Sequence, residues 1–408
     1  MRFVAEKTTI PVPQVHGYAF QKNSPVGFAF MLIDFIDGHT LSDIDFLSLP
    51  ESRKAHFYEQ LAGFYIQLWA HEFPHIGSLT LSDNASGWTF DVPRRPLSIE
   101  LNAQEIEGLQ ACNIFRKDAI FRSAEDYFTS LIDLAFNLFE TSKNSVFDKY
   151  DAEIALYDLY QFKEVVKGWA DSMYNNGPFI LDHGDFRPHN IRVDDDLNIV
   201  GVIDWEWGRI VPVQLFIPPT WLTGRELLDL CRYLEREDYI RELTRFKSIV
   251  KDCGEEAAPL IEAWNSIEQD GAFLVSSALP NSTLIDTVYS KYFDMRRHNS
   301  PRIERVREFL QSDTRHRELI SKKVVDRSLY LEELRQLGLE ERDGVALPIE
   351  AAPTNSFGLG YLISAFSLSR WWYIYAERIK GVTLLSPSVI ATVGGLMVIT
   401  SILHRLFR

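Results

Sequence analysis

The chain has 408 residues, of which 46% are hydrophobic and 24% are charged, as expected of a globular protein with a sizeable core. Its formal net charge of −15 argues against a nucleic-acid partner, because a protein that binds the phosphate backbone needs a clustered basic face. The three cysteines are widely spaced and odd in number, which indicates a reducing compartment without a disulfide framework or a zinc pattern.

The N-terminal 40 residues predict a short helix followed by a small sheet. A helix over residues 1–9 must end at Ile10-Pro11-Val12-Pro13, because proline bars helical continuation. Two strands are then expected over 14–21 and 28–35, joined by a turn at 22–25.

The body of the chain is predicted to be mostly helical. Apolar residues recur on one face over residues 52–71, which is typical of an amphipathic helix. Three more helices and one short hairpin, over 191–203, complete the body; the helices are expected over 125–138, 154–173 and 227–250. The charged stretch 302–337 is again helical in pattern, and by default its outer face is solvated.

The C-terminal region has a different composition. Residues 346–380 are predicted to form a linker and an amphipathic segment, and residues 381–403 carry no charge at all. At about 1.5 Å per residue, 23 residues are enough to cross a bilayer core. Aromatic residues between 371 and 375 and basic residues on both flanks suit membrane interfaces, so a transmembrane helix is predicted. A buried apolar helix is the alternative.

The stretch 179–193 (FILDHGDFRPHNIRV) contains a carboxylate and an amide in one short loop. Asp185 can orient an attacking hydroxyl and accept its proton. Asn190, together with Asp204 in the following VIDWEWG, can supply hard oxygen ligands for Mg²⁺. Because a short hairpin separates Asn190 from Asp204, the three side chains are expected to converge.

Two neighbouring residues have expected supporting roles in the same loop. Arg187 can stabilise charge on a transferred group, although a surface arginine explains it equally well. His183 is expected to pack under the loop and hydrogen-bond its backbone.

A surface loop is the alternative to a site here, since Asp and Asn are common in turns. The presence of Asp185, Asn190 and Asp204 between apolar segments favours a functional site over a surface loop. By contrast, Asp194 to Asp196 are expected to form a solvated hairpin turn.

His71-Glu72-Phe73-Pro74-His75 matches the H-E-x-x-H pattern of zinc proteases, which need both histidines on one helical turn. Pro74 would break that turn, and a third ligand is not evident. We interpret the stretch as the end of a helix.

The motifs HGDFRPHN and VIDWEW resemble those of the aminoglycoside phosphotransferase family, whose members are small-molecule kinases of the protein-kinase-like superfamily. The stretches IPVPQVHGY, HEFPHIGSL and FIPPTWLTG resemble the fungal branch of that family, so the resemblance covers about residues 1–300. It implies an α+β, protein-kinase-like fold. Residues 1–40 would be a remnant of the N-lobe sheet with the hinge, and 41–345 a mostly helical C-lobe.

By this resemblance Asp185 is the catalytic base, and Asn190 and Asp204 are the metal ligands. The hinge strand would contact the adenine of ATP, or the base of GTP, through Met31, Ile33, Asp34 and Phe35. The family's phosphate-covering loop and phosphate-binding lysine have no match in the chain. The sequence is therefore expected to be truncated at its N-terminus.

Two hypotheses follow. The first is a small-molecule phosphotransferase that moves the γ-phosphate of ATP or GTP to a substrate hydroxyl with Mg²⁺, impaired in this truncated form. The alternative is a non-catalytic, kinase-like binding module tethered to a membrane. Both place the body of the protein in the cytoplasm, with an anchor at 381–403. Neither the acceptor nor the oligomeric state follows from the sequence.

Overall fold

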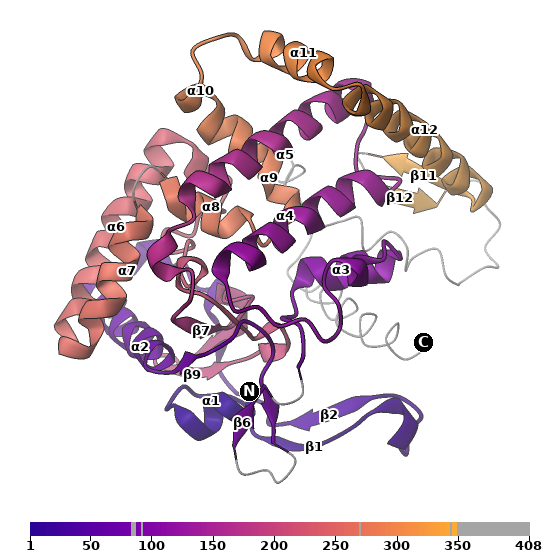
Figure 1. Ribbon diagram of the computed structural model, residues 1–408. Helices are drawn as coiled ribbons and strands as arrows, with labels where there is room; N and C mark the ends of the chain where they lie inside the picture. Colours follow the sequence, from indigo (N-terminus) through magenta and orange to yellow (C-terminus); the bar gives the residue numbers. More distant parts are fainter. Residues whose placement is uncertain (83–86, 91–92, 269–270, 343–344, 349–408) are drawn as a thin grey trace.

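The N-terminal elements of the computed structural model match the expected order. The model describes residues 1–348 apart from 83–86, 91–92, 269–270 and 343–344. Helix α1 (Arg2–Lys7) ends before the two prolines, and β1 (Val15–Ala19) pairs antiparallel with β2 (Phe30–Ile33). This hairpin extends away from the helical body (Figure 1), and every residue of β2 is exposed.

The described residues form two three-stranded sheets. In one, β7 (Phe179–Asp182) runs between β4 (Glu72–Phe73) and β10 (Arg209–Pro212). In the other, β8 (Ile191–Val193) runs between β3 (His39–Thr40) and β9 (Ile199–Val202). Strands β7, β8, β9 and β10 carry mostly buried side chains, so the chain segments between them are fixed at both ends. A third hairpin joins β5 (Thr80–Leu81) to β6 (Trp88–Thr89).

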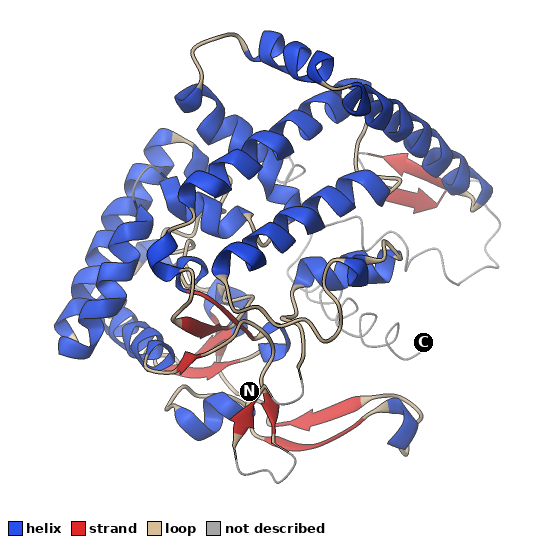
Figure 2. Ribbon diagram, viewed as in Figure 1, coloured by secondary structure: helices blue, strands red, loops and turns tan. Residues whose placement is uncertain are grey.

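Helices make up most of the fold (Figure 2). The helices up to α10 are α2 (Glu51–Trp69), α3 (Ile99–Glu107), α4 (Ala124–Thr141), α5 (Lys149–Trp169), α6 (Tyr233–Asp252), α7 (Ala258–Glu268), α8 (Ala272–Ala278), α9 (Ser282–Val288) and α10 (Asp294–Arg297). Several begin at a residue whose side chain accepts a hydrogen bond from the first turn, such as Ser98, Ser123 and Asp148. The four helices predicted from apolar spacing are confirmed as α2, α4, α5 and α6.

The stretch 302–337 was expected as one helical run, and it consists of two helices. Helix α11 (Arg302–Ser312) ends at Asp313, whose backbone is extended at φ −142° and ψ 130°. The Asp313 side chain accepts a hydrogen bond from the amide of Arg315, which starts α12 (Thr314–Gln336).

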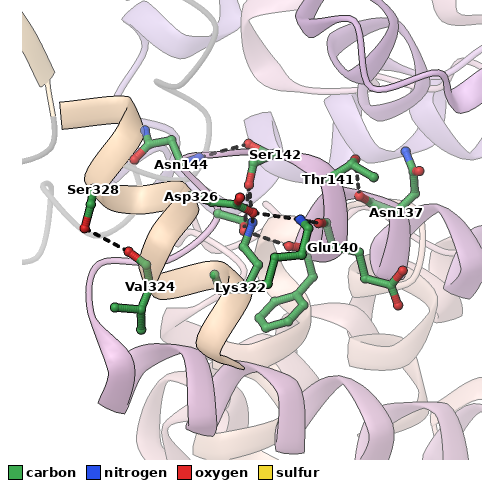
Figure 3. Close-up of polar contacts among 12 residues, drawn as sticks. Asn137, Glu140, Thr141, Ser142, Asn144, Lys322, Val324, Asp326 and Ser328 are labelled. Carbon is green, nitrogen blue, oxygen red and sulfur yellow. Dashed lines mark hydrogen bonds and ion pairs between the residues drawn. The ribbon is translucent and has the colours of Figure 1, made fainter. Parts of the chain in front are cut away.

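The outer face of α12 is exposed, as expected, but the opposite face also buries charged side chains, and Lys323 is fully buried there. Figure 3 shows how the helix docks on the C-terminal end of α4. Lys322 Nζ donates to the carbonyl of Glu140 at 2.6 Å, and Lys323 Nζ donates to the carbonyl of Ser142. The carbonyls at a helix C-terminus lack intrahelical partners and carry partial negative charge, so two ammonium groups stabilise that end.

The predicted fold class included a transmembrane helix, and the structure does not support that helix. Among the helices that the structure describes, none is both long and apolar enough to cross a bilayer. Residues 381–403, on which the prediction rested, lie outside the described residues. The predicted linker begins with β12 (Val345–Pro348), which pairs with β11 (Leu339–Arg342), and residues 349–380 are also outside the described part. The described chain is thus a mixed, mostly helical α+β fold.

The H-E-x-x-H stretch was interpreted as the end of a helix, and this is wrong: α2 already ends at Trp69, and Glu72–Phe73 form strand β4. The prediction for residues 194–196 agrees with the structure. At the tip of the β8–β9 hairpin, the Asp194 carboxylate accepts hydrogen bonds from the amides of Asp196 and Asn198. That is the expected polar turn.

Candidate active site

The loop that follows β7, residues 183–190, is called here the HGD loop, and His183 lies beneath it. His183 is 2% exposed, and its Nε2 donates to the carbonyl of Ile203 at 2.8 Å. Its Nδ1 accepts from the amide of Asp185 at 3.3 Å, so the ring is neutral. The ring thus connects the backbone of Asp185 to that of Ile203, next to Asp204. Burial lowers the pKa of His183 to about 4. The expected packing of His183 under the loop is confirmed.

Gly184 occupies a position that only glycine fits. Its φ is +80°, and a Cβ atom placed there would come within 2.2 Å of the carbonyl oxygen of Trp207. The HGD loop and the Trp205–Trp207 turn, which follows Asp204, therefore touch backbone to backbone.

Asp185 lies at the centre of the polar contacts of the loop. Its Oδ1 is 3.0 Å from Nε of Arg187, and its Oδ2 is 3.6 Å from Nε2 of His189 and accepts from Nδ2 of Asn190 at 3.2 Å. Burial alone would raise the pKa of Asp185, but the close approach of His189 and the charge of Arg187 outweigh it and lower the pKa below its usual value. Asp185 is therefore an ionised carboxylate at neutral pH.

The β8–β9 hairpin brings Asp204 back beside Asn190, as its spacing predicted. The amide of Ile203 donates to the carbonyl of Asn190 at 3.0 Å. Asp204 itself sits in the left-handed region at φ 62°, where the chain turns sharply into Trp205. Burial, and then the charge of Asp185, raise the pKa of Asp204. The charge of Asp185 is thus felt at Asp204.

The residues present fit a magnesium ion. Nδ2 of Asn190 donates toward Asp185, which leaves the Oδ1 atom of Asn190 as a hard oxygen acceptor. Asp204 adds a carboxylate whose ionised form is disfavoured by burial and by the charge of Asp185. Within the described residues no group of three His, Cys, Asp or Glu side chains forms a metal cage. Magnesium does not need one, because it commonly binds one or two protein oxygens together with water and phosphate oxygens.

Sequence reasoning did not single out Asp182 and Arg209. They are direct cross-strand partners on β7 and β10, and Nε of Arg209 is 4.0 Å from Oδ2 of Asp182. The Asp182 carboxylate also accepts from the amide of Gly184 at 3.0 Å, which starts the turn of the loop. Burial raises the pKa of Asp182, against the charge of Arg209. The sequence feature that could have indicated Asp182 is its position at the end of the otherwise apolar strand β7.

The predicted hinge residues lie on the β1–β2 hairpin. Met31 and Ile33 pair with β1, and Phe35 follows the strand with its side chain 87% exposed. The Asp34 carboxylate accepts from the amide of Gln14 at 3.1 Å and contacts Nε2 of His16 at 2.5 Å, so it closes the base of the hairpin. The contact of these residues with a nucleotide base stays a prediction.

Comparison with known proteins points to the same chemistry. The model of the family described as "Phosphotransferase enzyme family" (APH) matches residues 1–213, just over half of the chain, including the HGD loop and Asp204. The chain is also 24% identical over 228 residues to "Clavilactone A biosynthesis cluster protein Y" of Ampulloclitocybe clavipes. That match covers 55% of this chain and 52% of the relative, so the chain spans about half the length of this curated protein.

Proposed function

Because the chain belongs to the phosphotransferase enzyme family, we propose that it transfers the γ-phosphate of ATP or GTP to a hydroxyl group of a small molecule. The observation that carries the proposal is the convergence of Asp185, Asn190 and Asp204. The carboxylate of Asp185 accepts a hydrogen bond from Asn190, and the backbone bond from Ile203 to Asn190 brings the following Asp204 next to the same loop. Phosphoryl transfer depends on this kind of positioning and charge stabilisation.

Asp185 is proposed to act as the base. The acceptor hydroxyl donates a hydrogen bond to its carboxylate, which orients the oxygen lone pair toward the γ-phosphorus. As the new P–O bond forms, the bond between the γ-phosphorus and its bridging oxygen breaks. The nucleoside diphosphate leaves with that electron pair, and the hydroxyl proton passes to Asp185.

Asn190 and Asp204 are proposed to hold Mg²⁺, which when bound would neutralise charge on the nucleotide phosphates. Burial and then the charge of Asp185 raise the pKa of Asp204, and a cation bound there would offset both effects. Arg187 contacts Asp185 in this structure, and its side chain is 45% exposed. We propose that its guanidinium stabilises charge on the transferred group once substrates bind.

The test is Mg²⁺-dependent formation of nucleoside diphosphate by the full chain, measured across a panel of small hydroxyl compounds. Asp185→Asn keeps the size of the side chain but removes the base, and should lower kcat by at least about 100-fold. The matched control is Asp195→Asn at the exposed tip of the β8–β9 hairpin, which should retain the full rate. Absence of turnover with every acceptor, with nucleotide still bound, would favour a non-catalytic binding module.

We also propose that the reaction takes place in a reducing compartment, the cytoplasm, where ATP and GTP are abundant. The three cysteines are free, and Cys112 and Cys253 are exposed. Fractionation of cells that make the tagged protein tests the placement.

A further inference from the structure

The segment between β10 and α6 returns to the HGD loop. Its beginning is fixed, because Nε1 of Trp264 donates to the carbonyl of Phe216 at 2.9 Å and the Phe216 ring packs 5.3 Å from that of Tyr65. Near its middle it makes a tight turn, in which the amide of Gly224 donates to the carbonyl of Trp221 at 2.8 Å and Gly224 has φ +62°. Trp221 is thus held on a backbone that is itself restrained.

Trp221 makes a hydrogen bond to the backbone of the HGD loop. Its Nε1 donates to the carbonyl of Phe186 at 2.7 Å, and the rings of the two residues lie 6.1 Å apart. Phe186 directly follows Asp185, and its ring also contacts those of Tyr65 and His183. A side chain 35 residues away in sequence therefore contacts the peptide next to the proposed base.

The neighbouring carbonyls of the loop are satisfied from within it. The carbonyl of Asp185 accepts from the amide of Arg187 at 3.0 Å and from Nδ2 of Asn190 at 2.8 Å, and the carbonyl of Arg187 accepts from the amide of Asn190 at 2.9 Å. The Phe186 carbonyl lies between these two and takes its partner from another segment. A rotation of the peptide between Phe186 and Arg187 would break the Trp221 bond and tilt both internal ones.

We propose that Trp221 is a positioning residue that holds the peptide after Asp185, and so keeps the proposed base aligned with Arg187, His189 and Asn190. The inference rests on the proposed function for its kinetic consequence. Its structural part is independent of that function, since it concerns the order of the loop. A displacement of about 1 Å at a reacting group is enough to lower a rate by one to two orders of magnitude.

The test is Trp221→Phe in the full chain, which keeps an aromatic ring and removes the N–H donor. The matched control is Trp88→Phe on β6: Trp88 is also partly buried, and its Nε1 donates to Glu6 at 2.9 Å, away from the loop. Hydrogen–deuterium exchange should show faster exchange of the Arg187 and Asn190 amides in Trp221→Phe and unchanged exchange of both in Trp88→Phe.

In kinetics, Trp221→Phe should lower kcat roughly tenfold with little change in KM for the nucleotide, because alignment of the base is felt in the transition state. Trp88→Phe should leave both constants unchanged. A variant in which only packing is weakened would lose stability without this selective decrease in kcat at constant KM.

Unchanged exchange of the two loop amides in Trp221→Phe would overturn the inference even if the protein is an active phosphotransferase. A protein with no turnover but faster loop exchange would instead keep the positioning contact and reject the proposed function. The two failures are therefore distinguishable.

Discussion

Gly184 and His183 determine the shape of the HGD loop, one through its backbone and the other through its ring. Gly184 adopts a left-handed φ against the carbonyl of Trp207. His183 bonds the carbonyl of Ile203 on one side and the amide of Asp185 on the other. Both contacts join the loop to the segment that carries Asp204, so the two halves of the candidate site are held against each other.

Replacement of Gly184 by alanine should destabilise the protein by at least about 2 kcal/mol, since it adds backbone strain to a clash with a backbone atom that cannot move aside. Urea denaturation of the variant measures this loss. Gly63→Ala is the control: Gly63 lies within α2 with open space around its Cβ position, and alanine there should stabilise the helix by up to about 1 kcal/mol. A neutral effect of Gly184→Ala would contradict the close packing of the loop.

The pKa of His183 predicts a loss of stability in acid. The folded state holds its pKa near 4, well below the unfolded value of about 6.5. The stabilising effect of the neutral ring is therefore complete above pH 6.5 and is lost as the pH falls toward 4, by roughly 3 kcal/mol. Denaturation at pH 7 and pH 4.5 should show this difference in the natural protein and a smaller one in His183→Gln. An equal pH dependence of the two would rule out the buried neutral ring.

Among the elements, α12 shows how a charged helix becomes part of the core. Lys323 is fully buried between the carbonyl of Ser142 and the carboxylate of Asp326, 3.0 Å away, while Lys322 reaches the neighbouring carbonyl of Glu140 from an exposed position (Figure 3). Burial lowers the pKa of Lys323, against the opposing effect of Asp326. The same type of contact therefore exists in a buried and an exposed form on one helix.

Lys323→Ala should cost about 2–4 kcal/mol of unfolding free energy, because it leaves a cavity and removes a buried partner of Asp326 and of the end of α4. Lys322→Ala should cost about 1 kcal/mol or less, since its ammonium is half exposed and screened. Chemical denaturation of both variants compares them directly. Equal losses would mean that burial does not decide the strength of these contacts.

At the scale of the whole molecule, the family match stops inside a continuous core. Residues 1–213 match the family, yet one hydrophobic cluster runs from Phe3 to Ile320. Tyr65 on α2 packs 5.2 Å from Trp264 on α7, and the hydroxyl of Tyr58 donates to Glu242 on α6 at 2.8 Å. The helices after residue 213 thus complete the core of the matched region.

A fragment of residues 1–213 should therefore fail to form a stable fold, because it exposes the apolar face of α2 that α6 and α7 cover. Circular dichroism and thermal unfolding of the fragment, beside residues 1–348 as the control, test this. A cooperative transition in the short fragment would show that the family region folds independently.

The sequence alone determined the local part of this protein. Proline placement ended α1, apolar spacing located α2, α4, α5 and α6, and the short distance from Asn190 to Asp204 across a hairpin brought the two together. These features were predictable because they depend on neighbours within about 20 residues. The resemblance that named the family is carried by the same local motifs, and the family match confirms it.

Only the tertiary structure decided the long-range contacts. The burial of Lys323, the pairing of Asp182 with Arg209 and the bond from Trp221 to Phe186 join segments far apart in the sequence. The sequence pattern ranks a lysine on a charged helix as solvated, because it carries no information on which helix end will lie opposite. The local motif specifies which groups are available, and packing determines which of them meet and how their charges are shifted.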